Sequence, residues 1–157
     1  MAKHGRPSSG REVDDDHEDE PHDPPGSIVI FGNLYSSKNS KEIRFNRVSG
    51  KRFVGNNSNV LKQKKDILWQ LKGNALKQKW KMLTKNKSYP LRLRFTIYRK
   101  SKQRFDYVNI IQILLDCMVD ARFIADDNAD VVIPSFAPYR IDRENPRTIV
   151  EVLHGDI

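Results

Sequence analysis

Acidic residues are almost absent from the long middle part of this 157-residue chain. Residues 27–105 contain 21 Lys and Arg but only two acids, Glu42 and Asp66, which gives this part a net charge of +19. Residues 106–157 reverse the balance with four Arg against ten acids, a net charge of −6. A cationic surface attracts polyanions and releases the counterions of a nucleic acid on binding. The scarcity of acids therefore favours nucleic acid as the partner of the first part.

Cysteine and histidine are also scarce, which excludes two kinds of site. The single cysteine, Cys117, permits no disulfide within the chain, and its apolar neighbours indicate a small core residue. Three of the four histidines lie in the first 22 residues, so the rest of the chain has no His/Cys ligand set for zinc.

The chain also lacks an apolar run of roughly 20 residues and an apolar secretory signal. We therefore expect a soluble, cytoplasmic protein without a membrane partner.

The first 26 residues are poor in apolar side chains. They hold eight acids and three bases, but only Met1, Ala2 and Val13 are apolar. Such a segment cannot bury enough surface to offset its conformational entropy. We expect a disordered acidic tail over residues 1–26, which either keeps the protein soluble or folds back over the cationic part. The remaining residues, 27–157, are long enough for one folded domain.

The first part of this domain is expected to contain strands. Apolar residues at 28–31 indicate a short strand. The segments at 43–45 and 52–54 flank a turn at 48–51, which is typical of a β-hairpin.

A basic amphipathic helix is predicted from residue 59 to about residue 83, where apolar residues recur at helical spacing and lysines fill the other faces. Gly73 interrupts the pattern, so two shorter helices are the alternative. Trp69 and Trp80 lie 11 residues apart, on one face of a continuous helix. This spacing favours core packing for both over stacking on bases.

The second part of the domain mixes strands with an apolar helix. Residues 91–98 alternate between apolar and polar, as in a half-buried strand. A helix over residues 107–120 is expected to be buried along most of its girth, and two further strands are expected at 131–133 and 148–153. The fold class is therefore α+β, a single domain with a mixed β-sheet packed by two main helices. One side of the 107–120 helix is expected to carry Val108, Ile111, Leu115 and Met118.

Three aspartates, Asp106, Asp126 and Asp127, are the best candidates for chemistry. Magnesium prefers hard oxygen ligands, and a bound ion activates water and neutralises charge on a leaving phosphate. Each aspartate has a structural alternative, because Asp106 stands at a helix N-cap position and Asp126-Asp127-Asn128 is typical of a turn. A shared ion further requires the chain after Ala121 to return about 20 Å along the helix.

Several segments of the chain form a pattern in sequence order: Ser37-Lys38-Asn39-Ser40, a basic tract before Phe105-Asp106-Tyr107-Val108-Asn109, then Leu115-Asp116, Asp126-Asp127, and a strand after Asn145-Pro146. Together they resemble the RusA-type Holliday junction resolvases that are common in bacteria and their phages. The resemblance implies a homodimeric, magnesium-dependent endonuclease with a RusA-like fold, which nicks two opposed strands of a four-way DNA junction in recombination and repair.

The resemblance also assigns roles to individual residues. It implies that Asp106 and Asp127, together with Asp126, are the catalytic residues and the metal ligands. Val108 and Gln112 depart from the family pattern, which has an aspartate and a lysine at these positions. Valine cannot ligate a metal, and glutamine lacks the charge of lysine. Supporting roles are expected for Asn109, Asp116 and Asp130.

The departures leave three accounts open. Asp126, Asp130 or Asp116 replaces the missing ligand, or the protein binds junctions without efficient cleavage, or it cuts another branched or flapped substrate. From other functional classes, the rivals are a non-enzymatic nucleic-acid-binding protein and a protein-interaction module that uses the basic helix on an acidic partner. In the endonuclease interpretation, the phosphates of the bound DNA are expected to contact Lys38, Lys41, Lys62, Lys65, Lys72, Arg99, Lys100, Lys102 and Arg104.

Overall fold

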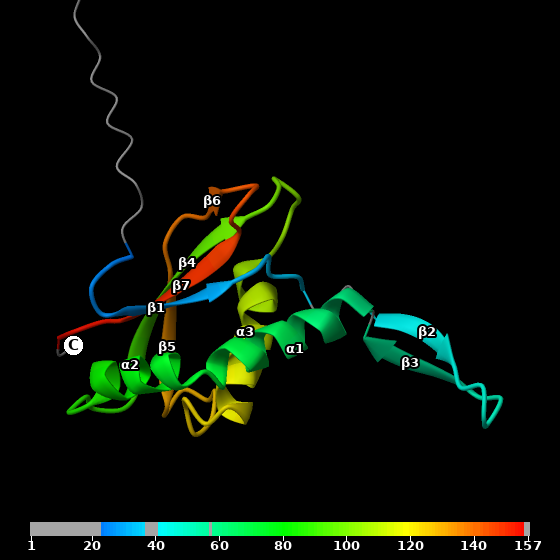
Figure 1. The fold of residues 1–157 in the computed structure, drawn as a ribbon, viewed down its shortest axis with the longest axis horizontal. Helices are drawn as coiled ribbons and strands as arrows, with labels where there is room; N and C mark the ends of the chain where they lie inside the picture. The colour runs from blue at the N-terminus through cyan, green and yellow to red at the C-terminus, as the bar shows by residue number, and fades with distance from the viewer. Residues whose placement is uncertain (1–22, 37–40, 57, 156–157) are drawn as a thin grey trace, which may run out of the picture.

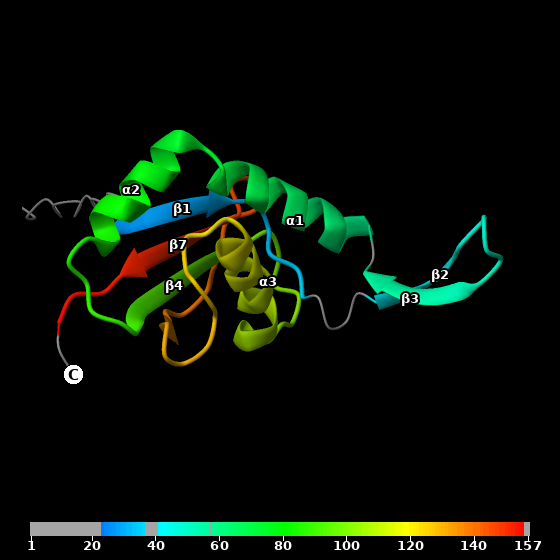
Figure 2. The same cartoon turned by 90° about the horizontal axis from the view of Figure 1, so that it is seen from below.

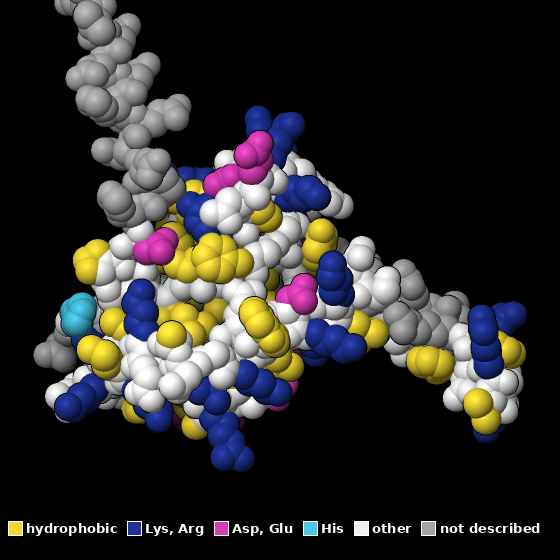
Figure 3. Space-filling view, in the orientation of Figure 1, with side chains coloured by type: hydrophobic (Ala, Val, Ile, Leu, Met, Phe, Trp, Pro, Cys, Tyr) yellow, Lys and Arg dark blue, Asp and Glu magenta, His cyan; other side chains and the backbone are white. Residues whose placement is uncertain are grey.

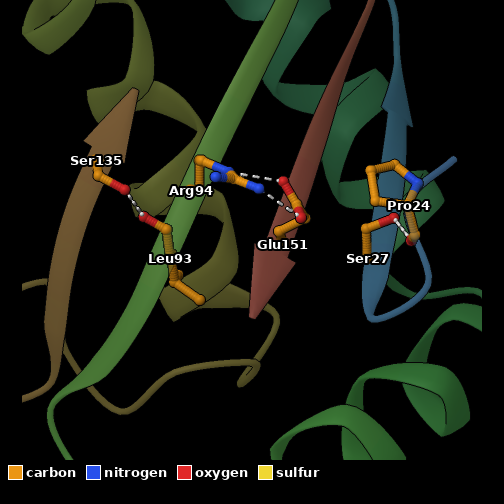
Figure 4. A network of polar contacts seen from close by, with 6 residues as sticks. All are labelled: Pro24, Ser27, Leu93, Arg94, Ser135 and Glu151. Atoms are coloured by element: carbon orange, nitrogen blue, oxygen red, sulfur yellow. Dashed lines mark hydrogen bonds and ion pairs between the residues drawn. The ribbon is translucent and has the colours of Figure 1, made fainter. Parts of the chain in front are cut away.

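The computed structural model describes residues 23–36, 41–56 and 58–155, and within these ranges it leaves the side chains of residues 41–44 and 56 undescribed. Residues 1–22 of the predicted tail lie outside the described part. The last residues of that tail are attached to the domain. The Ser27 hydroxyl donates a hydrogen bond to the Pro24 carbonyl at 2.7 Å (Figure 4), and the Val152 amide donates to the Gly26 carbonyl at 3.0 Å.

A mixed sheet forms the centre of the domain and confirms the predicted fold class. Four of its strands lie in the order β1-β7-β4-β5. Strand β7 is antiparallel to both β1 and β4, while β4 and β5 are parallel. A short strand, β6, pairs in parallel with the end of β4 and was not expected from the sequence. The strands are β1 (Ser27–Phe31), β4 (Leu91–Arg99), β5 (Val132–Phe136), β6 (Arg140–Ile141) and β7 (Arg147–Val152).

Three helices lie below the sheet in Figure 1, and Figure 2 shows them from that side. They are α1 (Ser58–Leu71), α2 (Asn74–Thr84) and α3 (Tyr107–Asp120). The predicted basic helix is therefore two helices, because Gly73 adopts an extended conformation with ψ 133° between them. Over residues 23–36, 41–56 and 58–155, no helix is both long and apolar enough to cross a bilayer.

The hydrophobic core lies between the sheet and the helices. Alternate residues of β4, such as Leu93 and Phe95, are fully buried and belong to the same hydrophobic cluster as Ile113 and Leu114 of α3. Each such side chain contributes about 1.5–3 kcal/mol by leaving water. The opposite side of the sheet is more polar. Here Arg94 and Glu151, which are paired across β4 and β7, form a bidentate ion pair at 2.9 and 3.0 Å (Figure 4).

Each edge strand of the main sheet, β5 and β1, has a residue whose backbone hydrogen-bonding groups are missing or already bonded to a side chain. β5 begins one residue later than the predicted strand and continues through Pro134, which has no N–H to donate and is tolerated because β5 is an edge strand. The carbonyl of Leu93, the partner of Pro134 on β4, accepts a hydrogen bond from the Ser135 hydroxyl at 3.2 Å (Figure 4). At the other edge, the side-chain amide of Gln70 bonds to both the N–H and the C=O of Phe31 at 2.8 Å.

The predicted hairpin forms a separate two-stranded sheet, called the arm below, from β2 (Lys41–Phe45) and β3 (Arg52–Asn56). Figures 1 and 2 both show the arm extending beyond the first turn of α1, away from the main sheet. Its turn is fixed by the Asn46 side chain, which accepts hydrogen bonds from the amides of Val48 and Ser49. Gly50 closes the turn with φ 67°, a conformation that favours glycine.

Candidate active site and nucleic-acid interface

A polar stripe runs along α3 on the side that does not face the core. Asn109, Gln112 and Asp116 are only half-buried, whereas the residues between them, such as Ile110 and Leu114, are buried in the core. Spacings of three and four residues place these polar side chains on one helical face. The stripe therefore offers amide and carboxylate groups to solvent along the helix.

Asp106 stands at the N-cap position of α3, but its side chain makes no capping hydrogen bond. Its carboxylate instead accepts a hydrogen bond from the Asn109 side-chain amide at 3.1 Å, and the residue is exposed. The capping alternative therefore does not explain this carboxylate, although the Asp106 carbonyl does accept the Ile110 amide of the first helical turn. The Asp106 carboxylate is held at the surface by the first residue of the polar stripe.

Gln112 joins two carboxylates that are distant in the sequence. Its side-chain nitrogen donates to Asp116 Oδ1 at 3.0 Å and to Asp127 Oδ2 at 2.7 Å. Because both oxygens are bonded to the same nitrogen, they lie no more than about 6 Å apart. The loop after α3 thus folds back against the helix, and it brings Asp127 to the polar stripe.

Asp126 and its neighbours form a turn closed by their own side chains. The Asp126 carboxylate accepts the Asp127 amide and the Asn128 side-chain amide, both at 2.8 Å. Asn128 in turn accepts the Asp130 amide at 3.0 Å. This geometry matches the turn alternative for Asp126, and it gives the Asp126 carboxylate a clear structural task. The same turn orients Asp127 toward α3.

The structure brings Asp127 together with Asp116, and it places both at a different level of the helix from Asp106. Gln112, where Asp127 meets α3, lies six residues after Asp106, or about 9 Å along the helix axis. Two oxygens on one magnesium ion lie within about 4 Å of each other. In the described part of the chain, no three His, Cys, Asp or Glu residues are grouped so that they could hold a metal together. The predicted site of Asp106, Asp126 and Asp127 stays a prediction.

The donor chemistry of the Asp116–Asp127 pair nevertheless fits magnesium. This ion keeps several waters and needs only one or two carboxylates when substrate phosphates complete its shell. Asp116 and Asp127 would hold it if the Gln112 amide turned away from the position that it now occupies between them. Sequence reasoning named Asp116 as a supporting residue and as one of three possible replacements for the missing ligand. Its position in the second half of the 107–120 helix gave no sign of the loop that meets it.

Val108 is exposed, contrary to the prediction that it belongs to the apolar side of α3. It keeps 66% of its surface accessible, whereas Ile111, Leu115 and Met118 are buried as predicted. It belongs to the first turn of the helix, which extends past the edge of the core. An aspartate would be solvated at this position, so the family's second carboxylate is compatible with this backbone.

Most of the described lysines that were predicted to contact DNA are exposed. Lys62, Lys65 and Lys72 lie on or directly after α1, and Lys100, Lys102 and Arg104 lie in the loop that leads from β4 to Asp106. Figure 3 shows dark blue Lys and Arg side chains over the helices and on the arm, with few acids between them. Lys38 lies outside the described residues, and the side chain of Lys41 on β2 is also undescribed.

Arg99 is a correction to the predicted interface, because its side chain is buried with 4% of its surface accessible. Its guanidinium donates to the Gln103 carbonyl at 2.9 Å and stacks over the Phe105 ring at 4.2 Å. Burial lowers the pKa of this guanidinium from its ordinary value. Arg99 therefore braces the loop that carries Lys100, Lys102 and Arg104, and it does not present its own charge to a phosphate.

The two tryptophans have opposite environments, so the prediction of core packing is confirmed for Trp80 and wrong for Trp69. Trp80 is buried at 4% exposure, and its indole N–H donates to the Phe123 carbonyl at 2.8 Å. Trp69 keeps 79% of its surface accessible. Their spacing of 11 residues places them on one face only in a continuous helix. The extended Gly73 breaks that helix and changes the phase between them.

Comparison with known proteins does not assign the chain to a family. No protein-family model matches the sequence, and no curated protein sequence is significantly similar to it. The resemblance to the RusA-type resolvases therefore rests on the aspartates of α3 and the following loop, and on the basic half of the chain.

Proposed function

We propose that this protein binds branched DNA and cuts it as a magnesium-dependent endonuclease of the junction-resolving kind. The observation that carries the proposal is that Asp127 and Asp116 meet at Gln112. Gln112 and Asp116 belong to α3, the helix whose N-cap residue is Asp106. Carboxylates from two distant segments share one hydrogen-bond donor on a solvent-facing stripe. The exposed cations of residues 100–104 immediately precede this stripe in the chain.

Each part of the proposed site has a distinct task. The Lys and Arg side chains of α1 and the 100–104 loop position the DNA phosphates. Asn109 holds the Asp106 carboxylate, and Gln112 orients Asp116 and Asp127. A magnesium ion bound by Asp116 and Asp127 would supply a water nucleophile at neutral pH and neutralise charge on the phosphodiester.

The decisive test is cleavage of a synthetic four-way junction with magnesium. We expect two nicked products from the wild-type protein and a loss of at least about tenfold in rate for Asp116→Asn and Asp127→Asn, because each removes one of the two carboxylates that meet at Gln112 and would hold the ion. Asp120→Asn is the matched control, since Asp120 is exposed at the end of the same helix. Equal rates for the wild-type and both site variants would remove the proposed chemistry.

Restoring the family pattern gives a second arm of the test. In Val108→Asp/Gln112→Lys, an aspartate enters an exposed position and an ammonium group replaces the amide between Asp116 and Asp127. If the departures limit catalysis, the double variant cuts faster than the wild-type protein. If it is slower, Gln112 and Val108 belong to a different arrangement of the same chemistry.

Two opposed cuts require two active sites, so the proposal includes a homodimer on the junction. Sedimentation of the full-length protein with and without the junction measures this directly. A protein that stays monomeric in both states and releases only singly nicked products would limit the proposal to a nicking endonuclease.

The second candidate is a non-catalytic protein that binds junctions or other nucleic acids. It is favoured by the lack of a three-ligand group among the described side chains and by the use of Asp126 within its own turn. This candidate predicts salt-sensitive binding that a chelator does not change, and no product strands from the wild-type protein.

A further inference from the structure

Trp69 is an aromatic side chain that the fold leaves uncovered. It keeps 79% of its surface accessible in the middle of a well-formed helix. The core side of α1 carries Val60, Ile67 and Leu71, all of which are buried. At 100° per residue, Trp69 points nearly opposite to these residues. A large aromatic ring in this position contributes little packing to the domain, so most of its surface is accessible to a ligand.

Lysines surround Trp69 at helical spacing. Lys62, Lys65 and Lys72 are seven and four residues before it and three residues after it, and all three are exposed. These spacings place them on the face of Trp69. Lys72 follows the last residue of α1, but its amide still donates to the Leu68 carbonyl at 3.0 Å, so it continues the helical turn. The three cations and the ring form one stripe about 15 Å long.

The charge of this stripe selects the ligand. Asp66 is the one acid within α1 and lies three residues before Trp69 on the same face, so three cations outweigh one acid around the ring. A protein partner would have to be strongly acidic to cover three lysines, whereas a nucleic-acid strand offers a phosphate at every nucleotide. Each base also offers a flat face on which an aromatic ring can stack, independently of sequence. Bases in a duplex already stack on each other, so the ring fits an unpaired base.

We propose that α1 carries a binding site for an unpaired nucleotide strand, in which Trp69 stacks on a base and Lys62, Lys65 and Lys72 contact the neighbouring phosphates. The inference rests on the nucleic-acid binding of the proposed function, and it is independent of whether the protein cuts its substrate. It names the feature that would distinguish a branched or flapped DNA from plain duplex, namely unpaired bases at the branch.

Affinity measurements separate stacking from charge. With a single-stranded oligothymidine in the presence of chelator, we expect Trp69→Ala to weaken binding about tenfold, while Trp69→Phe retains most of the affinity. Binding to an intact duplex is expected to stay the same in both variants. Lys65→Ala is expected to weaken the binding of both the oligothymidine and the duplex. It should also reduce the slope of log affinity against log salt concentration by about 0.7 to 0.9. Met82→Ala is the matched control, because Met82 is equally exposed, at 76%, on α2.

Tryptophan fluorescence gives a direct readout of the ring. Trp80 is buried and bonded to Phe123, so its emission is expected to stay constant while the emission of Trp69 is quenched by a stacked base. In Trp69→Phe, the oligothymidine should leave the emission unchanged. Unchanged single-strand affinity in Trp69→Ala, or equal quenching in the wild-type protein and Trp69→Phe, would overturn the inference.

Two further measurements distinguish the nucleotide site from a self-association surface and from the cleavage site. If Trp69 becomes protected from a soluble quencher as the protein concentration rises without DNA, a second copy of the chain covers the ring and the inference is wrong. If junction cleavage fails but Trp69 is still quenched by the oligothymidine, the endonuclease proposal fails and the nucleotide site stands. If the junction is cut but the oligothymidine does not quench Trp69, the nucleotide site fails and the endonuclease proposal stands.

Discussion

Replacing Gln112 with glutamate tests whether Asp116 and Asp127 converge as the structure describes. The glutamine side-chain nitrogen lies 3.0 Å and 2.7 Å from oxygens of these two carboxylates. Glutamate has the same shape, but it places an oxygen of a third carboxylate where the Gln112 side-chain nitrogen was. The variant Gln112→Glu therefore removes two hydrogen bonds and adds two repulsive contacts. Gln112→Leu removes the same hydrogen bonds without adding charge, so it is the matched control.

The size of the effect follows from the distances. Two like charges about 4 Å apart repel by about 1 kcal/mol in water and about 4 kcal/mol at an effective dielectric constant of 20. All three side chains are half-buried and can turn partly toward solvent, so screening reduces the sum for the two contacts. We expect Gln112→Glu to be about 1–3 kcal/mol less stable than Gln112→Leu in the absence of divalent cations.

A divalent cation should reverse this difference, because three converging carboxylates form a binding site that the unfolded chain lacks. A cation at about 100 times its dissociation constant contributes about 2.7 kcal/mol to the stability of Gln112→Glu. Urea unfolding followed by the emission of the buried Trp80, with magnesium or with chelator, measures both effects. If Gln112→Glu is as stable as Gln112→Leu in chelator and gains nothing from magnesium, the two aspartates do not meet at residue 112.

Three further measurements probe the core and the loops. Leu71→Ala should lower the free energy of unfolding by about 2–5 kcal/mol in urea, while Trp69→Ala changes it by less than about 0.5 kcal/mol, because only Leu71 is buried. Burial raises the pKa of the Cys117 thiol to about 11, so a thiol reagent at pH 7 should modify it only as fast as the domain opens. The hydrogen bond from Arg147 lowers the pKa of Asp142, so the stability difference between wild-type and Asp142→Asn should be present at pH 7 and disappear as the pH falls through this lowered pKa. A difference that persists unchanged at low pH would show that the ion pair is not its source.

Local patterns were sufficient to predict most of the elements. The alternation at 91–98 became β4, the apolar helix over 107–120 became α3, and the turn at 48–51 became the end of the arm. These features depend on side-chain period and turn residues within a few positions, which a sequence displays directly. The strand β6 has only two residues, and its pairing with β4 depends on the preceding loop, so no local sequence pattern predicted it.

Side-chain environments were harder to predict, because they depend on helix phase and on the extent of the core. Trp69 and Val108 are both exposed where an apolar face was expected. The extended conformation of Gly73 ends α1, so Trp69 does not share a helical face with the residues of α2. In α3, the first turn, which carries Val108, precedes the part of the helix that the core covers. Arg99 shows the reverse case, since its charge suggested a surface position but the Phe105 ring and the Gln103 carbonyl enclose it.

The grouping of carboxylates at the candidate site was not predicted from the sequence. Sequence reasoning selected Asp106, Asp126 and Asp127 as one site, and the structure places Asp127 beside Asp116. The turn at Asp126 and Asn128 determines how far the loop returns along the helix. The hydrogen bond between Gln112 and Asp127 then holds the returned loop against the helix, and composition and spacing do not encode this contact.

The guarded edges of the sheet limit how this protein can assemble. Pro134 lacks the N–H that an incoming strand would need on one side, and Gln70 occupies the backbone N–H and C=O of Phe31, the last residue of β1, on the other. Strand addition by a neighbouring molecule, the usual route to fibrous aggregates, is therefore disfavoured at both ends. If the proposed DNA binding brings many copies together on one molecule, this protection would counter the strand addition that such crowding promotes.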